Sequence, residues 1–399
     1  MSVASSQQQV FLRLLRQLAP HWRTDFTLAK RIQALLAGER SFGSRDRRLY
    51  RELLYTALRY LPWVEPLLES DPARAAKISS WLAADTRDTR TYRAELSADW
   101  PNLSSLAERA AFLDAEATDL LPAWFREECP EVFTPVELEA QLARAPLWLR
   151  LQTHQPAPVK EEFAAAHWRT TESPELSSAW RVHGEADITK STAYAKGLVE
   201  IQDLGSQFVL TSLRLEEGGR WLDACAGAGG KTLQLAELLG AEGSVEAHDI
   251  RPEALDELLQ RAERAGLENV RTVDQPARAA YDGVLVDAPC SGSGTWRRSP
   301  HLKWTTTPGI VGKRATVQHN LLAQFAASVR PGGQLVYATC SLSQRENAQV
   351  VDAFVASHPD FEPEHLKRTF GFKPVDKAIT ILPARHDTDG FFVAALRRR

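Results

Sequence analysis

The first 140 residues carry apolar side chains at the spacing of amphipathic helices, without the strict alternation of strands. One group begins at Val10, and a second surrounds Leu53 and Leu54. The positions are Val10, Leu12, Leu15 and Leu18, then Leu53, Leu54, Ala57, Leu58 and Leu61. This pattern predicts an all-α domain over residues 1–140.

The pattern changes at residues 146–152, where apolar and polar positions alternate as in a strand. A mixed stretch with Pro156, Pro158 and Pro174 follows. We therefore expect a small connecting α+β subdomain over residues 141–204.

From residue 205 onward, short apolar runs alternate with helical patterns. Strands are predicted at 220–224, 244–248, 270–273, 284–286, 334–338 and 391–396, and helices at 231–239, 252–265, 314–329 and 345–357. Strands that alternate with helices form a doubly wound α/β sheet through right-handed crossovers. Residues 205–399 are thus predicted to form a Rossmann-like domain.

Composition narrows the class of protein. The chain has 399 residues, of which 44% are hydrophobic and 25% charged, and its net charge is −3. These values are typical of a soluble globular protein. The sequence shows no signal peptide and no apolar run of membrane-spanning length, and four cysteines do not make a disulfide framework. We expect a cytoplasmic protein that contacts no membrane.

Positive charge is concentrated at the beginning of the chain. The first sixty residues contain eleven lysines and arginines against four acidic residues, whereas residues 65–139 are rich in Asp and Glu. Two interpretations remain open: the solvated faces of helices, or a surface that binds RNA phosphates.

A glycine-rich turn between a predicted strand and helix is the candidate cofactor loop. A P-loop would need glycine where Cys225 stands, and a dinucleotide fingerprint would need glycine in place of Thr232. The remaining interpretation is a nucleoside cofactor without a pyrophosphate, such as S-adenosylmethionine. The candidate contacts are Cys225, Ala226, Gly227, Ala228, Gly229, Gly230 and Lys231.

Two acidic residues follow the next two predicted strands. Asp249 stands 22 residues after Gly227, where an acidic side chain commonly accepts hydrogen bonds from ribose hydroxyls. Asp274, after the third strand, is expected on the adenine side of the same ligand.

Two further apolar runs end at cysteines, in Asp287-Ala-Pro-Cys-Ser-Gly292 and in Ala338-Thr-Cys-Ser341. If these strands are neighbours, Cys290 and Cys340 face one pocket at the carboxyl edge of the sheet. Two buried core cysteines would be the ordinary alternative. A zinc site that includes Cys225 lacks the usual Cys-x-x-Cys or paired His spacing, so no metal is expected.

Such a pair of thiols suits covalent chemistry on an electrophilic carbon. Carbon 5 of cytosine becomes nucleophilic once a thiolate has attacked carbon 6, and it can then accept a methyl group from a sulfonium donor. Asp287 is the candidate to hydrogen-bond the edge of the ring. The attacking thiol needs a lowered pKa, which a basic neighbour or a helix start would provide.

These motifs resemble those of the RNA 5-methylcytosine methyltransferases, from about Pro146 to the C-terminus. The resemblance rests on Cys225–Lys231, Asp249, Asp274, the two cysteine motifs and Asp389-Gly-Phe-Phe-Val-Ala394. It implies that Cys340 is the nucleophile and that Cys290 assists product release. In place of the family's usual Ala-Pro pair the loop has Gly227-Ala228, which should loosen the turn without removing its backbone donors.

The helical beginning, with Gly43-Ser-Arg45-Asp46-Arg47-Arg48, is similar to the NusB-like RNA-binding domain of the small-subunit rRNA members. The resemblance implies an enzyme that methylates carbon 5 of a cytosine in structured RNA, such as small-subunit rRNA. We expect it to be a monomer. The alternatives are methylation of tRNA or DNA cytosine, or a non-catalytic ribosome assembly factor.

Basic side chains just after Cys290 are candidates to hold RNA phosphates, and an ordinary solvated loop is the alternative. They are Arg297, Arg298, His301 and Lys303.

Overall fold

The computed structural model describes residues 2–399, which fold into two compact units. The first unit contains the chain up to Arg144 together with residues 295–308, and the second contains residues 145–294 and 309–399. The short segment after the first cysteine motif thus folds with the helical unit, which the sequence pattern did not indicate. The expected domain limits at residues 140 and 204 stay a prediction.

The first unit is all-helical, as the spacing of apolar residues predicted. Its α-helices are α1 (Val3–Leu18), α2 (Leu28–Gly38), α3 (Ser44–Arg59), α4 (Leu61–Val64), α5 (Leu67–Ser70), α6 (Pro72–Leu82), α7 (Arg90–Leu96), α8 (Leu106–Leu113), α9 (Pro135–Leu142) and α15 (Leu302–Thr305). Short 3-10 turns occupy Ala117–Leu120, Ala123–Arg126 and Pro130–Phe133. The start of α3 follows from local chemistry, because the Asp46 carboxylate accepts a hydrogen bond from the Gly43 backbone N–H at 3.0 Å.

The segment 295–308 corrects one expectation about RNA contacts. Arg297 and Lys303 are only 1% and 2% exposed, and His301 is also buried, whereas Arg298 is exposed. Lys303 Nζ donates to the carbonyls of Arg59 and Leu120 at 2.9 and 3.0 Å. Three of the four side chains expected to hold phosphates are therefore buried within the helical unit, and only Arg298 is exposed.

The second unit begins with a four-stranded antiparallel sheet. Its strands, in the spatial order β2-β3-β1-β4, are β1 (Leu147–Leu151), β2 (Arg169–Glu172), β3 (Ala179–His183) and β4 (Val199–Ile201). The helices α10 (Ala157–Ala165) and α11 (Thr192–Ala195) and a 3-10 turn at Ile188–Lys190 accompany it. Strand β1 confirms the strand that we predicted at residues 146–152.

The main sheet of the second unit is mixed, with the order β10-β12-β9-β8-β5-β6-β7 and β11 paired to β12. Its strands are β5 (Arg220–Asp223), β6 (Ser244–Ala247), β7 (Val270–Thr272), β8 (Tyr281–Asp287), β9 (Val329–Thr339), β10 (Phe361–Glu364), β11 (Ile379–Ile381) and β12 (Phe391–Arg398). Strands β5 to β9 are parallel, and β12 runs antiparallel to β9. This Rossmann-like arrangement confirms the predicted fold class.

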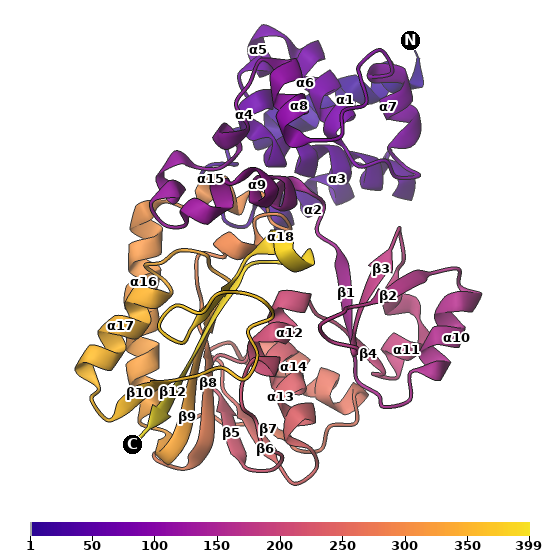
Figure 1. Ribbon diagram of the computed structural model, residues 1–399. Coiled ribbons are helices and arrows are strands. Elements are labelled where there is room, and N and C mark those ends of the chain that lie inside the picture. Colours follow the sequence, from indigo (N-terminus) through magenta and orange to yellow (C-terminus); the bar gives the residue numbers. More distant parts are fainter. Residues whose placement is uncertain (1) are drawn as a thin grey trace. The chain divides into compact units, whose positions relative to one another are not determined.

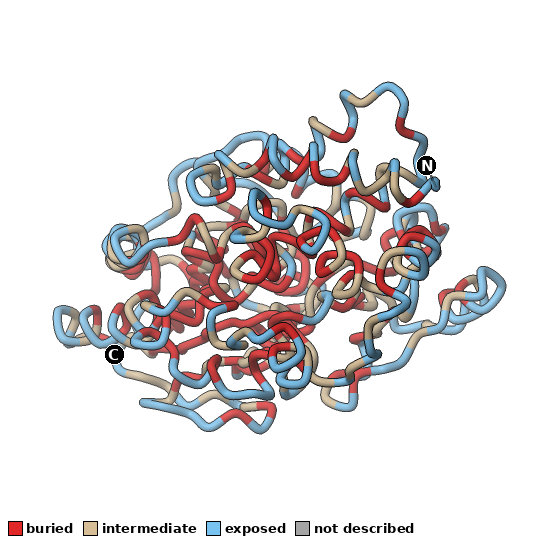
Figure 2. The backbone as a smooth tube through the Cα atoms, turned by 90° about the horizontal axis from the view of Figure 1, so that it is seen from above, coloured by how far each residue is buried: buried red, intermediate tan, exposed pale blue. Residues whose placement is uncertain are grey.

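Helices cover both faces of this sheet (Figure 1). They are α12 (Leu204–Thr211), α13 (Gly230–Leu239), α14 (Pro252–Arg264), α16 (Pro308–Ala326), α17 (Ala348–Ser357) and α18 (Pro383–His386). Along β9, Val336 packs with the residues of α12 and α13, whereas Leu335 and Tyr337 pack with those of α16 and α17. Because successive side chains point to opposite faces, the central strands are buried on both sides. Figure 2 colours buried residues of the chain red.

No helix in the described part of the chain is both long and apolar enough to cross a membrane.

Gly294 and Gly390 allow two backbone segments to lie in direct contact next to the loop of Cys340. Gly390 N donates to Gly294 O at 2.7 Å, and Gly294 N donates to the carbonyl of Cys340 at 2.9 Å. A Cβ atom on Gly294 would lie 2.1 Å from the Gly390 carbonyl oxygen. The loop after Cys290 can therefore reach the loop of Cys340 only with glycine at position 294.

We expect Gly294→Ala to destabilise the fold by about 1–3 kcal/mol, because the added methyl group must push two backbone segments apart. Gly312→Ala in α16 is the matched control, since no atom lies within 4 Å of its Cβ position. Thermal unfolding of both variants measures the difference. Equal melting temperatures would contradict the close approach described here.

Candidate active site

The two cysteine sulfurs lie side by side at the carboxyl edge of the main sheet. Strands β8 and β9 are parallel neighbours, with Asp287 opposite Ala338, and each chain reaches its cysteine a few residues later. Cys290 Sγ and Cys340 Sγ are 3.2 Å apart, and both residues are partly exposed. The structure thus brings together the two thiols that the sequence placed at strand ends.

The two thiols differ in their electrostatic surroundings. The pKa of the Cys290 thiol is raised well above its usual value, first by its hydrogen bond to Cys340 and then by burial. Cys290 therefore keeps its proton at neutral pH, and its sulfur is hydrogen-bonded to that of Cys340.

Lys231 and Asp287 form an ion pair beside the thiols. Lys231 Nζ donates to Asp287 Oδ2 at 2.8 Å, and the lysine side chain is buried. Burial lowers the pKa of Lys231, but the charge and hydrogen bond of Asp287 outweigh it, so the pKa is raised. The Lys231 ammonium also interacts electrostatically with Cys340. It is the basic neighbour that a reactive thiolate needs.

A buried carboxylate, Glu346, ties the two cysteine loops together. Its Oε1 accepts hydrogen bonds from Ser291 N at 2.8 Å and from Gln318 Nε2 at 3.0 Å. Its Oε2 accepts hydrogen bonds from the hydroxyls of Ser291 and Ser341. Gln318 of α16 also donates to the carbonyl of Pro289 at 3.0 Å. One fully buried side chain thereby fixes the residue that follows each cysteine.

The glycine-rich loop connects β5 to α13. Gly227 and Gly229 have φ values of 53° and 90°, in the left-handed region that favours glycine. A Cβ atom on Gly229 would lie 2.7 Å from Leu258 Cγ of α14. The loop therefore needs glycine at 229 for close helix packing, and this packing holds the start of α13 at the edge of the sheet.

Asp249 lies next to this loop, as its spacing predicted. Its Oδ2 accepts the Gly227 N–H at 2.8 Å, and Arg251 donates to both carboxylate oxygens through its guanidinium at 2.9 and 3.1 Å. Asp274 follows β7 by two residues and is exposed. Both acidic residues stand at neighbouring strand ends, because β6 pairs with β7.

Asp223, the last residue of β5, is a site residue that the sequence reading left unassigned. It is buried, and its Oδ2 accepts the Thr232 hydroxyl at 2.7 Å while Oδ1 has no partner among the described residues. Burial, together with the smaller effect of the negative charge of Asp287, raises the pKa of Asp223 to about 7. An orphaned buried carboxyl oxygen beside a glycine loop suits the ammonium group of an amino-acid moiety such as that of S-adenosylmethionine.

Comparison with known proteins identifies the family. Residues 210–397 match the profile of the 16S rRNA methyltransferases RsmB/F. The small-subunit rRNA methyltransferase B of Klebsiella pneumoniae is 32% identical over 305 residues, which cover 73% of this chain and 69% of that protein. The chain belongs to the RsmB/F family.

Two other relatives differ in how much of their length they share with this RsmB/F member. The Vibrio cholerae small-subunit rRNA methyltransferase B is 28% identical, with 92% of this chain and 93% of that protein covered. The probable counterpart of Bacillus subtilis is 37% identical, with 52% and 49% covered, so the match spans about half of that relative.

Solved structures share the fold. The methyltransferase homolog of Pyrococcus horikoshii superposes with a TM-score of 0.59 at 25% identity, covering 69% of this chain and 93% of that one. NSun6 of the same organism gives 0.62 at 20% identity, covering 69% and 98%. The match of residues 210–397 and the Klebsiella pneumoniae relative confirm the family resemblance drawn from the motifs. The chain is an S-adenosylmethionine-dependent RNA cytosine methyltransferase.

We expect Glu346→Gln to lower the rate of methylation about 100-fold, because the amide presents donors to the two serine hydroxyls and loosens both cysteine loops. Binding of S-adenosylmethionine, measured by calorimetry, should change less than about twofold. Glu257→Gln, an exposed residue of α14, is the control. An unchanged rate in the Glu346 variant would show that its hydrogen bonds do not position the thiols.

A pH-dependent effect on stability is expected for Asp223→Asn. The folded wild type keeps the Asp223 proton up to about pH 7, whereas the unfolded chain releases it near pH 4. Wild-type stability therefore falls as the pH rises between these values, and the asparagine variant escapes this loss. Thermal unfolding without cofactor from pH 5 to pH 8 should show a growing advantage for the variant. A constant difference would contradict the raised pKa.

Proposed function

We propose that this enzyme methylates carbon 5 of a cytosine in 16S rRNA through a covalent bond between Cys340 and carbon 6. The observation that carries the proposal is the contact between the sulfurs of Cys290 and Cys340, 3.2 Å apart, beside the ion pair of Lys231 and Asp287. A non-catalytic assembly factor would not need two thiols, a buried lysine and a carboxylate in one place.

Cys340 begins the reaction as a thiolate. Its sulfur attacks carbon 6 of the cytosine, the S–C6 bond forms, and the ring electrons shift toward carbon 5. The ammonium group of Lys231 and the S–H group of Cys290 both favour the negative sulfur before the attack. Asp287, held by Lys231, is the candidate to hydrogen-bond the edge of the ring.

Bound S-adenosylmethionine would supply the methyl group that carbon 5 takes up. The residues suited to hold it are the loop Cys225–Lys231 with Asp249, Asp274, Asp287 and the added Asp223. Among these, Asp249 suits ribose hydroxyls, because its carboxylate lies against the glycine loop at Gly227.

Cys290 acts at the end of the reaction. When a base removes the proton from carbon 5, the S–C6 bond breaks and the Cys340 sulfur leaves as a thiolate. The Cys290 S–H group, at its 3.2 Å distance, stabilises this leaving sulfur. The target base must first leave its stack, at a cost of a few kcal/mol, which is lowest in a loop or in partly unfolded RNA.

The proposed setting is the cytoplasm, with the enzyme working as a monomer on rRNA. Both sulfurs come from one chain, so the thiol pair needs no partner subunit. All four cysteines are free, and two thiols in contact stay reduced only in a reducing compartment.

We expect Cys340→Ala to abolish methylation without forming an adduct. Cys290→Ala should instead accumulate a covalent protein–RNA complex, because release of the Cys340 sulfur is slowed. Both effects are read on a denaturing gel with 16S rRNA and S-adenosylmethionine. Cys129→Ala, a buried cysteine of the helical unit, is the control and should behave as wild type.

The same assay separates the alternatives. Tritium from labelled S-adenosylmethionine should enter 16S rRNA, and transfer to tRNA or duplex DNA alone would overturn the rRNA assignment. An adduct formed by Cys340→Ala and not by Cys290→Ala would reverse the two cysteine roles.

A further inference from the structure

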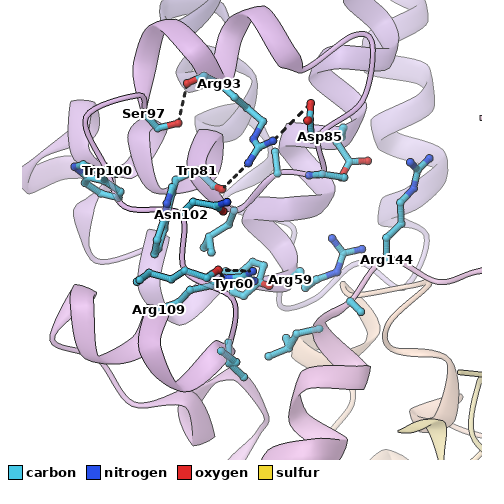
Figure 3. A pocket seen from close by; sticks show the side chains of 18 of the residues that line it. Arg59, Tyr60, Trp81, Asp85, Arg93, Ser97, Trp100, Asn102, Arg109 and Arg144 are labelled. Atoms are coloured by element: carbon cyan, nitrogen blue, oxygen red, sulfur yellow. Dashed lines mark hydrogen bonds and ion pairs between the residues drawn. The ribbon is translucent and has the colours of Figure 1, made fainter. Parts of the chain in front are cut away.

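The helical unit contains a cavity of about 760 Å³, far in sequence from the cysteine motifs. Its walls come from α3, α6, α7, α8 and α9 and from the loop at residues 97–103 (Figure 3). Five arginines and three acidic residues line it. The volume lies within the range of small-molecule sites.

Most of these charges are already satisfied within the cavity wall. Arg90 and Arg93 pair with Asp85 at 3.2 and 3.7 Å, and Arg93 also donates to the Ser80 and Trp81 carbonyls. Glu139 accepts the Leu106 N–H at 2.6 Å. Arg109 donates to the Leu103 carbonyl. The two lining arginines not yet accounted for are Arg59 and Arg144.

Arg59 is the unusual member of this group. It is only 7% exposed, its Nη2 donates to the Arg297 carbonyl at 3.3 Å, and its Nε is buried without a partner. Burial lowers the pKa of Arg59, and the nearby Arg297 and Arg144 lower it further, while Glu52 opposes this effect through space. A buried guanidinium without an anion is costly, so this position favours a negatively charged ligand.

Arg144 complements this buried charge from the surface. It is exposed, and no carboxylate in residues 2–399 forms an ion pair with its side chain. Arg59 and Arg144 influence each other electrostatically. Together they offer one enclosed and one accessible guanidinium, an arrangement that suits the oxygens of a phosphate.

Aromatic rings line another part of the same cavity. Trp81 and Trp100 lie edge to face with ring centroids 5.4 Å apart, and Trp81 Nε1 donates to the Pro101 carbonyl at 2.8 Å. Both rings are partly exposed. Figure 3 shows Trp100 and Arg144 on opposite sides of the cavity. Fixed, partly exposed indole rings are typical platforms for the bases of single-stranded nucleic acids.

We propose that this cavity binds a nucleotide of single-stranded RNA, with its phosphate at Arg59 and Arg144 and its base against Trp81 or Trp100. The inference rests on the proposed RNA substrate and adds a second, non-catalytic contact to it. This contact would anchor the RNA while another nucleotide reacts at Cys340.

The test is RNA binding by the full-length protein, with Arg144→Ala as the main variant. The probe is a fluorescein-labelled eight-nucleotide oligouridylate, followed by fluorescence anisotropy at several salt concentrations. We expect Arg144→Ala to weaken binding about tenfold and to reduce the salt slope by about 0.7, the loss of one single-strand phosphate contact. Arg74→Ala is the control, because Arg74 is exposed on α6 outside the cavity lining.

The aromatic wall is tested separately. Trp100→Leu should weaken oligouridylate binding at least about fivefold, while Trp100→Phe should retain most of it, because stacking needs an aromatic face. Thermal unfolding of each variant establishes that the helical unit is intact. Equal affinities of Arg144→Ala and Arg74→Ala would overturn the proposal, as would equal affinities of the two Trp100 variants.

Methylation of 16S rRNA by the wild type is measured in parallel, so that the two proposals can fail independently. If the wild type does not methylate 16S rRNA but its RNA binding depends on Arg144, only the proposed function is contradicted. If the wild type methylates 16S rRNA but Arg144→Ala binds RNA as tightly as the control, only the proposal for the cavity is contradicted.

Discussion

Parallel pairing of β8 with β9 places Asp287 opposite Ala338, and each strand is followed within three residues by its cysteine. This register brings the sulfurs to 3.2 Å, a distance at which both cannot be ionised together. The hydrogen bond between the sulfurs raises the pKa of the Cys290 thiol, so Cys290 keeps its proton at neutral pH. Glu346 maintains this geometry, because its four hydrogen bonds join the loop of Cys290, the loop of Cys340 and α16.

One buried cation lies beside two acidic side chains at this edge of the sheet. Lys231 is a buried cation, and it faces the carboxylate of Asp287 directly and the carboxyl of Asp223 nearby. There is one positive charge for two acidic groups, and burial is the main cause that raises the pKa of Asp223. A ligand that carries a sulfonium and an ammonium group would bring positive charge to this place and favour ionised Asp223. Cofactor binding and the proton on Asp223 are thus linked.

Short-range patterns in the sequence were sufficient to predict which site residues lie at strand ends. Cys290 and Cys340 close apolar runs, so their neighbourhood follows from the order of parallel strands. The glycine spacing similarly located the cofactor loop. Glu346 could not be found this way, because a polar residue before a helix looks like an ordinary surface residue until Ser291 is seen to donate to it. The signal that existed was the pair of serines directly after the two cysteines.

The error at Arg297 and Lys303 has the same origin, since a count of basic residues says nothing about what their donors face. The excess of positive charge in the first sixty residues shows this too, because five of its arginines pair with carboxylates; they are Arg13, Arg16, Arg23, Arg31 and Arg48. Arg59, by contrast, is buried with an unpartnered nitrogen. In a chain with net charge −3, RNA contacts must come from such local arrangements, because the field of the whole protein does not attract a polyanion.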